Sequence, residues 1–329
     1  MKRVLAALFA TSCVFAVTLA AQAQEKFPNR PVRIITAFAP GSATDIIARV
    51  VGEQMRQTLG QGVIVENRPG AFGIIAIEEM ARAKPDGHTV MVGNVSTSII
   101  TPLLFAKKFS INYEKDVVPV ARVAAIPNFL LVTTKDFPPK TLPEFIEYAK
   151  ARPGKLRFAS SGMGSFPQYD MEILAKRAGL DMIHIPMKEG PPGIMKDMAA
   201  GDIQASFINV ASSAALVKSG QLRPLAVVTE ERLPEYPDVP TMKELGFAGV
   251  GTVLWSAMFA PAGTPPDVID TLHAAVNAAL ASSQAQETFK KQLIRPIPAA
   301  SVQETRTWLR DEMDKWVRIT GEIKIDIAE

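Results

Sequence analysis

Residues 31–59 read PVRIITAFAPGSATDIIARVVGEQMRQTL, and this stretch predicts a strand, a tight turn and a helix. The run at 31–38 is almost continuously apolar, which is typical of a strand covered on both faces. Proline, glycine and serine at 40–42 predict a tight turn. From 45 to 59 the apolar residues return at helical spacing. A buried strand that leads directly into an amphipathic helix is the repeating unit of α/β proteins.

The alternation continues along the chain and predicts an α/β fold with mainly parallel sheets. We expect further strands at 63–66, 89–93, 156–160, 182–186, 203–210 and 224–229, and further helices at 73–83, 142–151, 165–178, 193–200, 266–282 and 302–319. A capping box from Ser301 to Glu304 marks the start of the last helix.

Two extended stretches, 117–133 and 253–260, lack helical periodicity and suit a chain that crosses between two lobes. A chain of 329 residues is also long enough for about two domains. We therefore expect a bilobed molecule with one lobe built from residues 24–124 plus 255–329, and the other from residues 125–254.

The N-terminus predicts export. Lys2 and Arg3 precede an apolar stretch at 4–21, and Ala21-Gln22-Ala23 forms a small-x-small cleavage pattern. We expect residues 1–23 to be a cleavable signal peptide and the mature protein to be periplasmic. A membrane anchor is the alternative, because the stretch approaches a spanning length. A lipoprotein signal at Cys13 is disfavoured, since apolar residues follow it directly.

The charge balance argues against nucleic acid as a partner. Lysine and arginine number 36 against 33 acidic residues, a net charge of +3, and without Lys2 and Arg3 the basic count falls to 34. Binding to nucleic acid requires a clustered basic face. Cys13 is the only cysteine, so the mature chain has neither a disulfide nor a thiol nucleophile.

A Gly/Ser loop follows a strand in each predicted lobe. The first contains Pro40, Gly41, Ser42 and Thr44, and the second runs from Ser160 to Ser165. The first turn of a helix has unpaired N–H groups and a partial positive charge, which suits a carboxylate or phosphate. The alternative is that these hydroxyls only cap the helices. The second loop lacks the lysine of a phosphate-binding loop and the third glycine of a dinucleotide fingerprint.

The residues of catalytic centres are scarce. His88, His184 and His273 form no i+3 or i+4 pair, and no G-x-S-x-G motif occurs. We expect His184 to be a core residue and His273 to lie on the surface. We expect no metal, no cofactor and no enzymatic activity, although an exported enzyme remains an alternative.

Aromatic residues at the turns and on the return crossing are core residues or pocket walls: Phe38, Phe72, Phe166 and Trp255.

Nine motifs in order resemble the Bug or TctC family of periplasmic receptors of tripartite tricarboxylate transporters. They span nearly all of the mature chain and read FPNRPVR at 27–33, FAPGSATD at 38–45, VENRPG at 65–70, KPDG at 84–87, ARPGKL at 151–156, ASSG at 159–162, GQLRPLA at 220–226, PDVPT at 237–241 and APAGTPP at 260–266.

The resemblance implies a type II periplasmic-binding-protein-like fold, in which a monomer closes on a small carboxylate and delivers it to inner-membrane transporter subunits. It implies that the two Gly/Ser loops hold the ligand carboxylates. The residues implicated are Phe38, Pro40, Gly41, Ser42, Thr44 and Asp45 in one lobe, and Ser160, Ser161, Gly164, Ser165 and Phe166 in the other. An orphan receptor that presents its ligand to a membrane sensor kinase is an alternative.

The chain departs from the family pattern at positions that bear on the ligand. Phe72 stands before Gly73 where the family has a glycine, and Ile208 precedes Asn209 where an acid is frequent. Lys188 lies in a Pro-Met-Lys-Glu-Gly version of the family's Pro-Tyr-Lys-Gly and could reach a ligand. These departures predict a less polar pocket, and a mono- or dicarboxylate with an apolar or aromatic body rather than citrate or aspartate.

Overall fold

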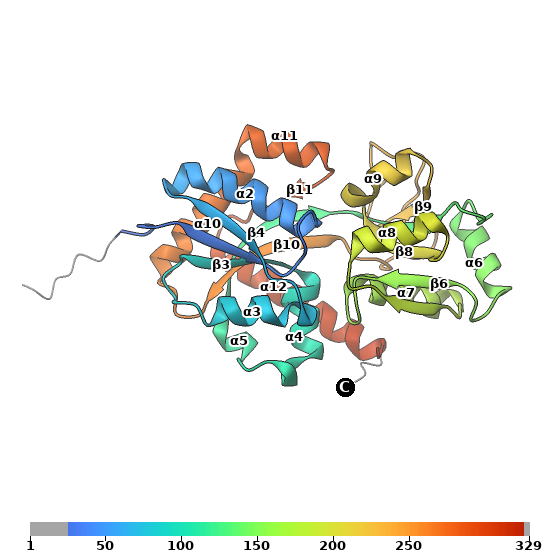
Figure 1. Cartoon of the computed structure of the whole chain (residues 1–329), viewed down its shortest axis with the longest axis horizontal. Helices are drawn as coiled ribbons and strands as arrows, with labels where there is room; N and C mark the ends of the chain where they lie inside the picture. The colour runs from blue at the N-terminus through green and yellow to red at the C-terminus, as the bar shows by residue number, and fades with distance from the viewer. Residues whose placement is uncertain (1–25, 326–329) are drawn as a thin grey trace, which may run out of the picture.

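The computed structural model describes residues 26–325, whose strands form two separate sheets (Figure 1). The first sheet has the order β11-β4-β10-β3-β1-β2, with β1 Val32–Thr36, β2 Val63–Asn67, β3 Thr89–Asn94, β4 Val117–Ile126, β10 Leu254–Pro261 and β11 Arg295–Pro296. The second has the order β7-β6-β8-β5-β9, with β5 Asn128–Thr133, β6 Arg157–Ser160, β7 Ile183–Pro186, β8 Ala205–Asn209 and β9 Leu222–Val227.

The helices divide between the same two lobes. The first lobe contains α2 Ala43–Leu59, α3 Ile74–Ala81, α4 Thr101–Leu104, α5 Tyr113–Asp116, α10 Pro266–Ala281, α11 Ser283–Lys291 and α12 Val302–Glu322, with short turns η1 Ala71–Gly73, η2 Ser96–Ile100 and η3 Ala106–Lys108. The second contains α6 Leu142–Lys150, α7 Phe166–Ala178, α8 Pro191–Ala200 and α9 Val210–Lys218.

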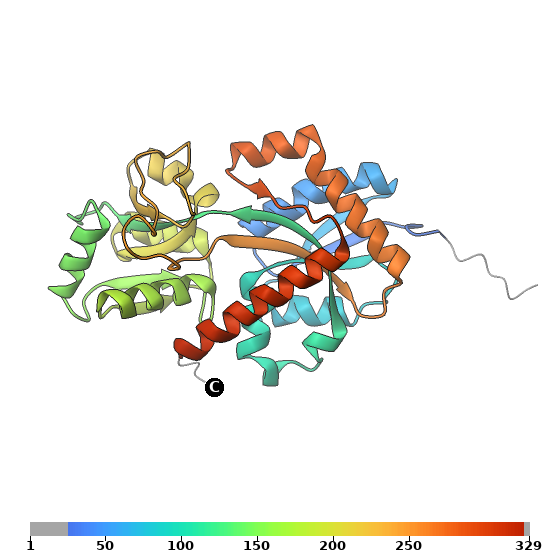
Figure 2. The ribbon, with the colours of Figure 1, turned by 180° about the vertical axis from the view of Figure 1, so that it is seen from behind.

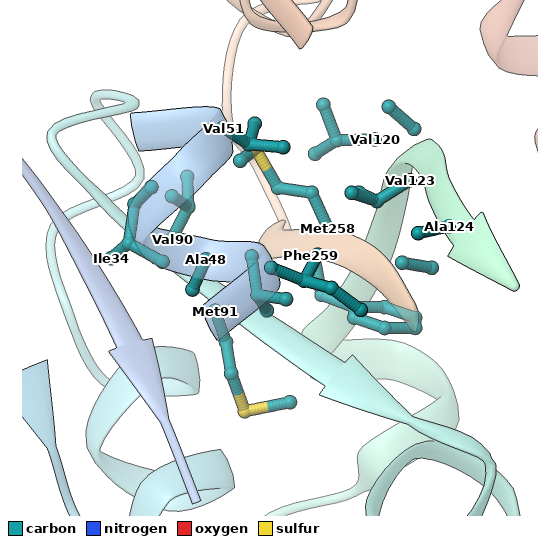
Figure 3. Packing of buried hydrophobic residues seen from close by; sticks show 14 of the residues in the cluster. Ile34, Ala48, Val51, Val90, Met91, Val120, Val123, Ala124, Met258 and Phe259 are labelled. Atoms are coloured by element: carbon teal, nitrogen blue, oxygen red, sulfur yellow. The ribbon is translucent and has the colours of Figure 1, made fainter. Parts of the chain in front are cut away.

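The first lobe is a sheet covered on both faces. The parallel strands β1, β2 and β3 continue into the antiparallel strands β10 and β4. Ile34 from β1, Met91 from β3 and Phe259 from β10 are fully buried and pack in one core (Figure 3). Apolar side chains on both faces of a strand need helices on both sides, which explains the apolar run of β1.

The chain passes from the first sheet to the second at Pro127. Residues 117–133 were expected to be one extended stretch, but they form two strands: β4 pairs in the first sheet and β5 pairs in the second. Proline has no N–H to donate to a ladder, so the pairing changes partner at this position. The chain returns along β10, which pairs with β4 in the first sheet.

Helix α12 also joins the lobes. Figure 2 shows it running from the first lobe toward the second. Its predicted start is confirmed, because the Ser301 hydroxyl accepts a hydrogen bond from Glu304 N at 3.1 Å. Near its other end the fully buried Trp316 meets Tyr169 of α7 edge to face, with ring centroids 5.6 Å apart. The second lobe therefore contacts α12 as well as the crossing strands.

Several parts of the fold differ from what the sequence pattern predicted. The sheets were expected to be mainly parallel but are mixed, because β4, β5, β9, β10 and β11 pair antiparallel. The region from η2 to α5 and the helices α9 and α11 were not expected, because each is short or has few apolar residues. His273 was expected on the surface but is only 7% exposed, since α10 packs between its neighbours. Among residues 26–325, no helix is long and apolar enough to cross a membrane. The signal-peptide prediction concerns residues 1–23, outside the described range.

Candidate functional site

The two Gly/Ser loops occupy equivalent positions in the lobes. The first connects β1 to α2, and the second connects β6 to α7. In both cases a strand that pairs in parallel ends at the loop, and the N-terminus of a helix follows it. Each loop therefore presents the positive end of a helix dipole at the carboxyl edge of a sheet.

An ionic network around the buried Asp45 holds the first loop. Asp45 accepts hydrogen bonds from Gly41 N at 2.9 Å and from Asn67 Nδ2 at 2.8 Å, and Arg49 Nε donates to it at 3.1 Å. Asn67 Nδ2 also donates to Phe38 O at 2.8 Å. Burial raises the pKa of Asp45, but the hydrogen bonds from Arg49, Asn67 and Gly41 outweigh it and keep the pKa below its usual value. Asp45 thus stays ionised and fixes the loop from behind.

Neutral side chains hold the second loop. The carbonyl of Gly162 accepts hydrogen bonds from Ser160 Oγ at 2.8 Å and Ser165 Oγ at 2.7 Å. His184 Nε2 lies 2.7 Å from Ser160 Oγ. Because Ser160 has one hydroxyl proton and directs it at Gly162, His184 must be the donor at Nε2. Two hydroxyls and an imidazole thereby fix the orientation of one peptide group.

Backbone donors remain available in both loops. The N–H groups of Ala43 and Thr44, and those of Ser161, Gly162 and Met163, have no acceptor among residues 26–325. The N–H groups of Gly41 and Gly164 are already used, by Asp45 and by Gln168 Oε1 at 2.8 Å. Unpaired N–H groups at a helix N-terminus bind anions. The donors that could meet a ligand are thus next to the predicted glycines.

Ser160 and His184 resemble a nucleophile and its base, but their environment opposes that role. The Ser160 residue is 0% exposed, and its proton is directed to the Gly162 carbonyl. Burial lowers the pKa of His184 to about 4, so it is a weak base. Among the described residues, no group of three or more His, Cys, Asp or Glu side chains could hold a metal. The pair therefore acts as support for the loop.

The turn after β3 connects the two loops, and its role was missed at the level of sequence. Asn94 Nδ2 donates to the buried Thr44 hydroxyl at 3.1 Å, and Asn94 Oδ1 accepts from Ser96 N at 3.0 Å. Ser96 Oγ accepts from Phe166 N, the first residue of α7, at 3.3 Å. This path crosses from one lobe to the other. In the sequence, one feature indicates this role: the predicted strand ends in polar residues next to a predicted anion-binding loop.

The second loop also touches the first lobe at Gly164. A Cβ atom at Gly164 would lie 2.8 Å from Leu104 Cδ1 and 3.5 Å from the Phe105 ring. Phe105 in turn stacks on Phe72, with centroids 4.5 Å apart and an interplanar angle of 10°. Gly73 approaches Thr97 so closely that a Cβ would lie 2.7 Å from its Cγ2. Both glycines are therefore required for close packing.

The remaining predicted site residues divide by exposure. Pro40, Gly41 and Lys188 are exposed, whereas Ile208 and Asn209 are buried at the end of β8. Asn209 Oδ1 accepts from Ser212 N at 2.8 Å and caps α9. The buried Ile208 and Asn209 can therefore affect the site only through the backbone or through packing.

A buried carboxylate ties α7 to the return crossing. Asp170 is 1% exposed and accepts hydrogen bonds from Thr252 N and Thr252 Oγ1, both at 2.8 Å. Thr252 O accepts a hydrogen bond from Asn128 Nδ2 at the start of β5. Burial raises the pKa of Asp170 to about 7, although the Thr252 bonds and the charge of Lys315 partly oppose this. The helix that carries the second loop is thus bonded to both crossings.

Two surface grooves lie away from these loops. One, of about 490 Å³, separates α11 and β11 from residues 233–235 of the second lobe. The other, of about 500 Å³, lies between α10 and the start of α12. Neither is lined by a residue of the two loops. The candidate site is defined by the paired loops and their free backbone donors.

The chain is similar to known proteins along most of its length. Residues 47–325 match the family model TctC, "Tripartite tricarboxylate transporter family receptor". Three solved structures share the fold. The periplasmic binding protein BugD is 29% identical with a TM-score of 0.81, covering 90% of this chain and 98% of that one. R. palustris Rpa4515 with adipate is 28% identical with a TM-score of 0.83, covering 90% and 97%.

The third structure is MatC from Rhodopseudomonas palustris with bound malate, which is 31% identical with a TM-score of 0.81 and covers 89% of this chain and 99% of that one. These similarities confirm the predicted bilobed, periplasmic-binding-protein-like α/β fold. Two of the three proteins are described with a small dicarboxylate.

Proposed function

Because the chain belongs to the family of tripartite tricarboxylate transporter receptors, we propose that it captures a small carboxylate between its two lobes. The free N–H groups beside Ser42 and Ser161 carry this proposal, since they give each lobe backbone donors for an anion, at the start of α2 in one lobe and in the loop before α7 in the other. A carboxylate held at each loop favours the closed arrangement through contacts with both lobes. The contacts of Ser96 and Gly164 across the lobes support this mode of closure.

The lobes in this proposal are residues 24–124 with 255–329, and residues 125–254. This division is supported by the strand pairing, because β5 to β9 pair in the second sheet and the other strands pair in the first. We further propose that the chain is exported with residues 1–23 as a cleavable signal, and that it delivers its ligand to inner-membrane transporter subunits. The family match supports both statements.

The proposed ligand is a mono- or dicarboxylate with an apolar or aromatic body. The dicarboxylates described for Rpa4515 and MatC support the acid groups. The exposed Phe72 supports the apolar body. A citrate-like ligand would instead need polar side chains to pair its hydroxyl and third carboxylate.

A calorimetric panel on residues 24–329 tests the proposal. The panel contains adipate, terephthalate, malate, citrate and aspartate, each at matched pH and ionic strength. We expect adipate- or terephthalate-like acids to bind and to raise the melting temperature. Binding of citrate or aspartate with no response to the other acids would contradict the proposed ligand class. Turnover of any member would favour an exported enzyme.

A further inference from the structure

Phe72 has a conformation that an aromatic residue rarely adopts. Its φ is 58° and its ψ is 20°, in the left-handed region, and its neighbour Ala71 has a φ of 44°. Such a conformation costs roughly 1–3 kcal/mol in a non-glycine residue. Thr101 Oγ1 donates to Phe72 O at 2.8 Å and holds the backbone in place. Strain of this kind that the surroundings maintain points to a functional position.

The Phe72 ring is exposed on one side and stacked on the other. The residue is 44% exposed, although most aromatic residues among those the structure describes are buried or half-buried. One face lies against the buried Phe105 at a centroid distance of 4.5 Å. A parallel stack fixes the ring plane, so the ring is held in one orientation before any ligand binds.

The residues next to this ring link it to both loops. Gly73, the next residue, would bring a Cβ to 3.5 Å from Ala37 Cβ, at the start of the first loop. Phe105, the partner ring, lies 3.5 Å from a Cβ placed on Gly164, in the second loop. Lys108 Nζ lies 5.5 Å from the centroid of Phe105 and adds a positive charge beside the stack. A ligand that spans the loops therefore passes close to this oriented aromatic pair and to the charge of Lys108.

We infer that Phe72 is a specificity-determining residue that stacks on the ring of an aromatic carboxylate held by the two loops. This inference rests on the proposed function and narrows its ligand class to ring-bearing acids. The left-handed backbone presents the ring, Phe105 supports it from behind, and the loop N–H groups hold the carboxylate. A second aromatic ring on the exposed face completes an offset stack and removes that face from water.

The test compares two dicarboxylates of similar span, terephthalate with a ring and adipate without one. Their dissociation constants are measured by calorimetry for the wild type, Phe72→Leu and Phe72→Gly. Ile64→Ala removes an exposed apolar side chain from β2 in the first sheet and is the matched control. Phe72→Gly also relieves the left-handed strain, so its melting temperature separates an effect on folding from one on recognition.

We expect the wild type to prefer terephthalate. Both Phe72 variants should weaken terephthalate about tenfold and change adipate by less than about threefold, because only the ring loses a stacking partner. Ile64→Ala should change neither. Equal effects on both acids, no effect, or a wild type that prefers adipate would overturn the inference and leave the proposed function standing. A wild type that binds no carboxylate would overturn the proposed function, and the inference with it.

Discussion

The loop before α2 and the loop before α7 both offer free backbone N–H groups, but different chemistry holds them. Asp45, Arg49 and Asn67 hold the first loop through charges within its own lobe. Ser160, Ser165 and His184 hold the second through neutral groups, and its remaining support comes from the other lobe. The first loop is thus held within its own lobe, whereas the second depends in part on contacts with the other lobe.

This difference predicts which substitutions damage the site and how. A change that keeps the lobes apart should act on the second loop, and a change of charge should act on the first. The effect of each substitution on ligand affinity is measured by calorimetry with the acid that binds best in the panel.

Gly164→Leu should have the largest effect. Its φ of 74° strains any other residue, and a Cβ there would lie 2.8 Å from Leu104 Cδ1 across the lobe boundary. We expect a loss of affinity of about a hundredfold or more, because the closed arrangement clashes.

The matched control is Gly179→Leu at the other end of α7. Gly179 has a φ of 66° and no atom within 4 Å of its Cβ position, so it introduces strain without a clash. It should lower the melting temperature and change affinity by less than about threefold. Equal losses of affinity in both variants would show that backbone strain, and not lobe contact, is what matters at Gly164.

Asp45→Ala should weaken binding about thirtyfold, since it leaves Gly41 N and the Asn67 amide without their buried acceptor and releases the loop. Glu53→Ala, which breaks an exposed pair with Arg56 on the same helix, is the control and should change affinity by less than twofold. If the two variants bind alike, the ionic network does not shape the first loop.

His184→Phe should weaken binding about fivefold, because Ser160 loses the donor that fixes its hydroxyl. His184→Gln supplies an amide donor and should recover most of the loss. Nitrogen NMR of the wild type should show a neutral imidazole protonated at Nε2 from about pH 5 to pH 8, since burial lowers its pKa to about 4. A charged ring in that range would contradict the neutral support of the second loop.

Asp170 and His184 should make the stability of the protein depend on pH, with little effect on ligand affinity. The folded-state pKa of Asp170, about 7, is above its unfolded value of 3.8, so its protonated form favours folding. Its contribution is complete below about pH 4 and is lost as pH rises through about 7. The lowered pKa of His184 acts in the opposite direction, adding stability as pH rises from about 4 to about 6.5.

Asp170→Asn should therefore remove the loss of stability that accompanies rising pH. Urea titrations between about pH 5 and pH 8 give the free energy of unfolding. In the wild type this free energy should fall as the pH rises. The fall should be shallow at the acidic end and steeper near neutrality. In Asp170→Asn the free energy of unfolding should stay level or rise. A decline that persists in this variant would assign the pH dependence to another group.

The sequence predicted the strand–turn–helix units and both loops because their signals are local. An apolar run and a glycine at the strand end are sufficient to place Gly41 and Gly162. The break at Pro127 and the contacts of Ser96 depend on which strands become neighbours, and no short window contains that information. For the same reason, burial of Asp170 and His273 appeared only with the packed helices around them.

The roles of the predicted site residues were harder to assign than their positions. Thr44 and Ser160 have hydroxyls suited to an anion, yet both are buried and bonded to protein groups. Residue type indicates chemistry, but accessibility depends on the neighbouring lobe. Whether the exposed members bind the ligand remains the prediction that the panel and the variants test.

The extension of α12 across the lobes has a spectroscopic consequence. The chain has three tryptophans, and Trp308 and Trp316 lie on α12 while Trp255 lies on the return strand β10. Trp255 donates to Glu312 of α12 at 2.8 Å, and Trp316 meets Tyr169 of the opposite lobe. All intrinsic indole emission therefore originates where the lobes are joined, so the unlabelled protein carries its own optical reporter of closure.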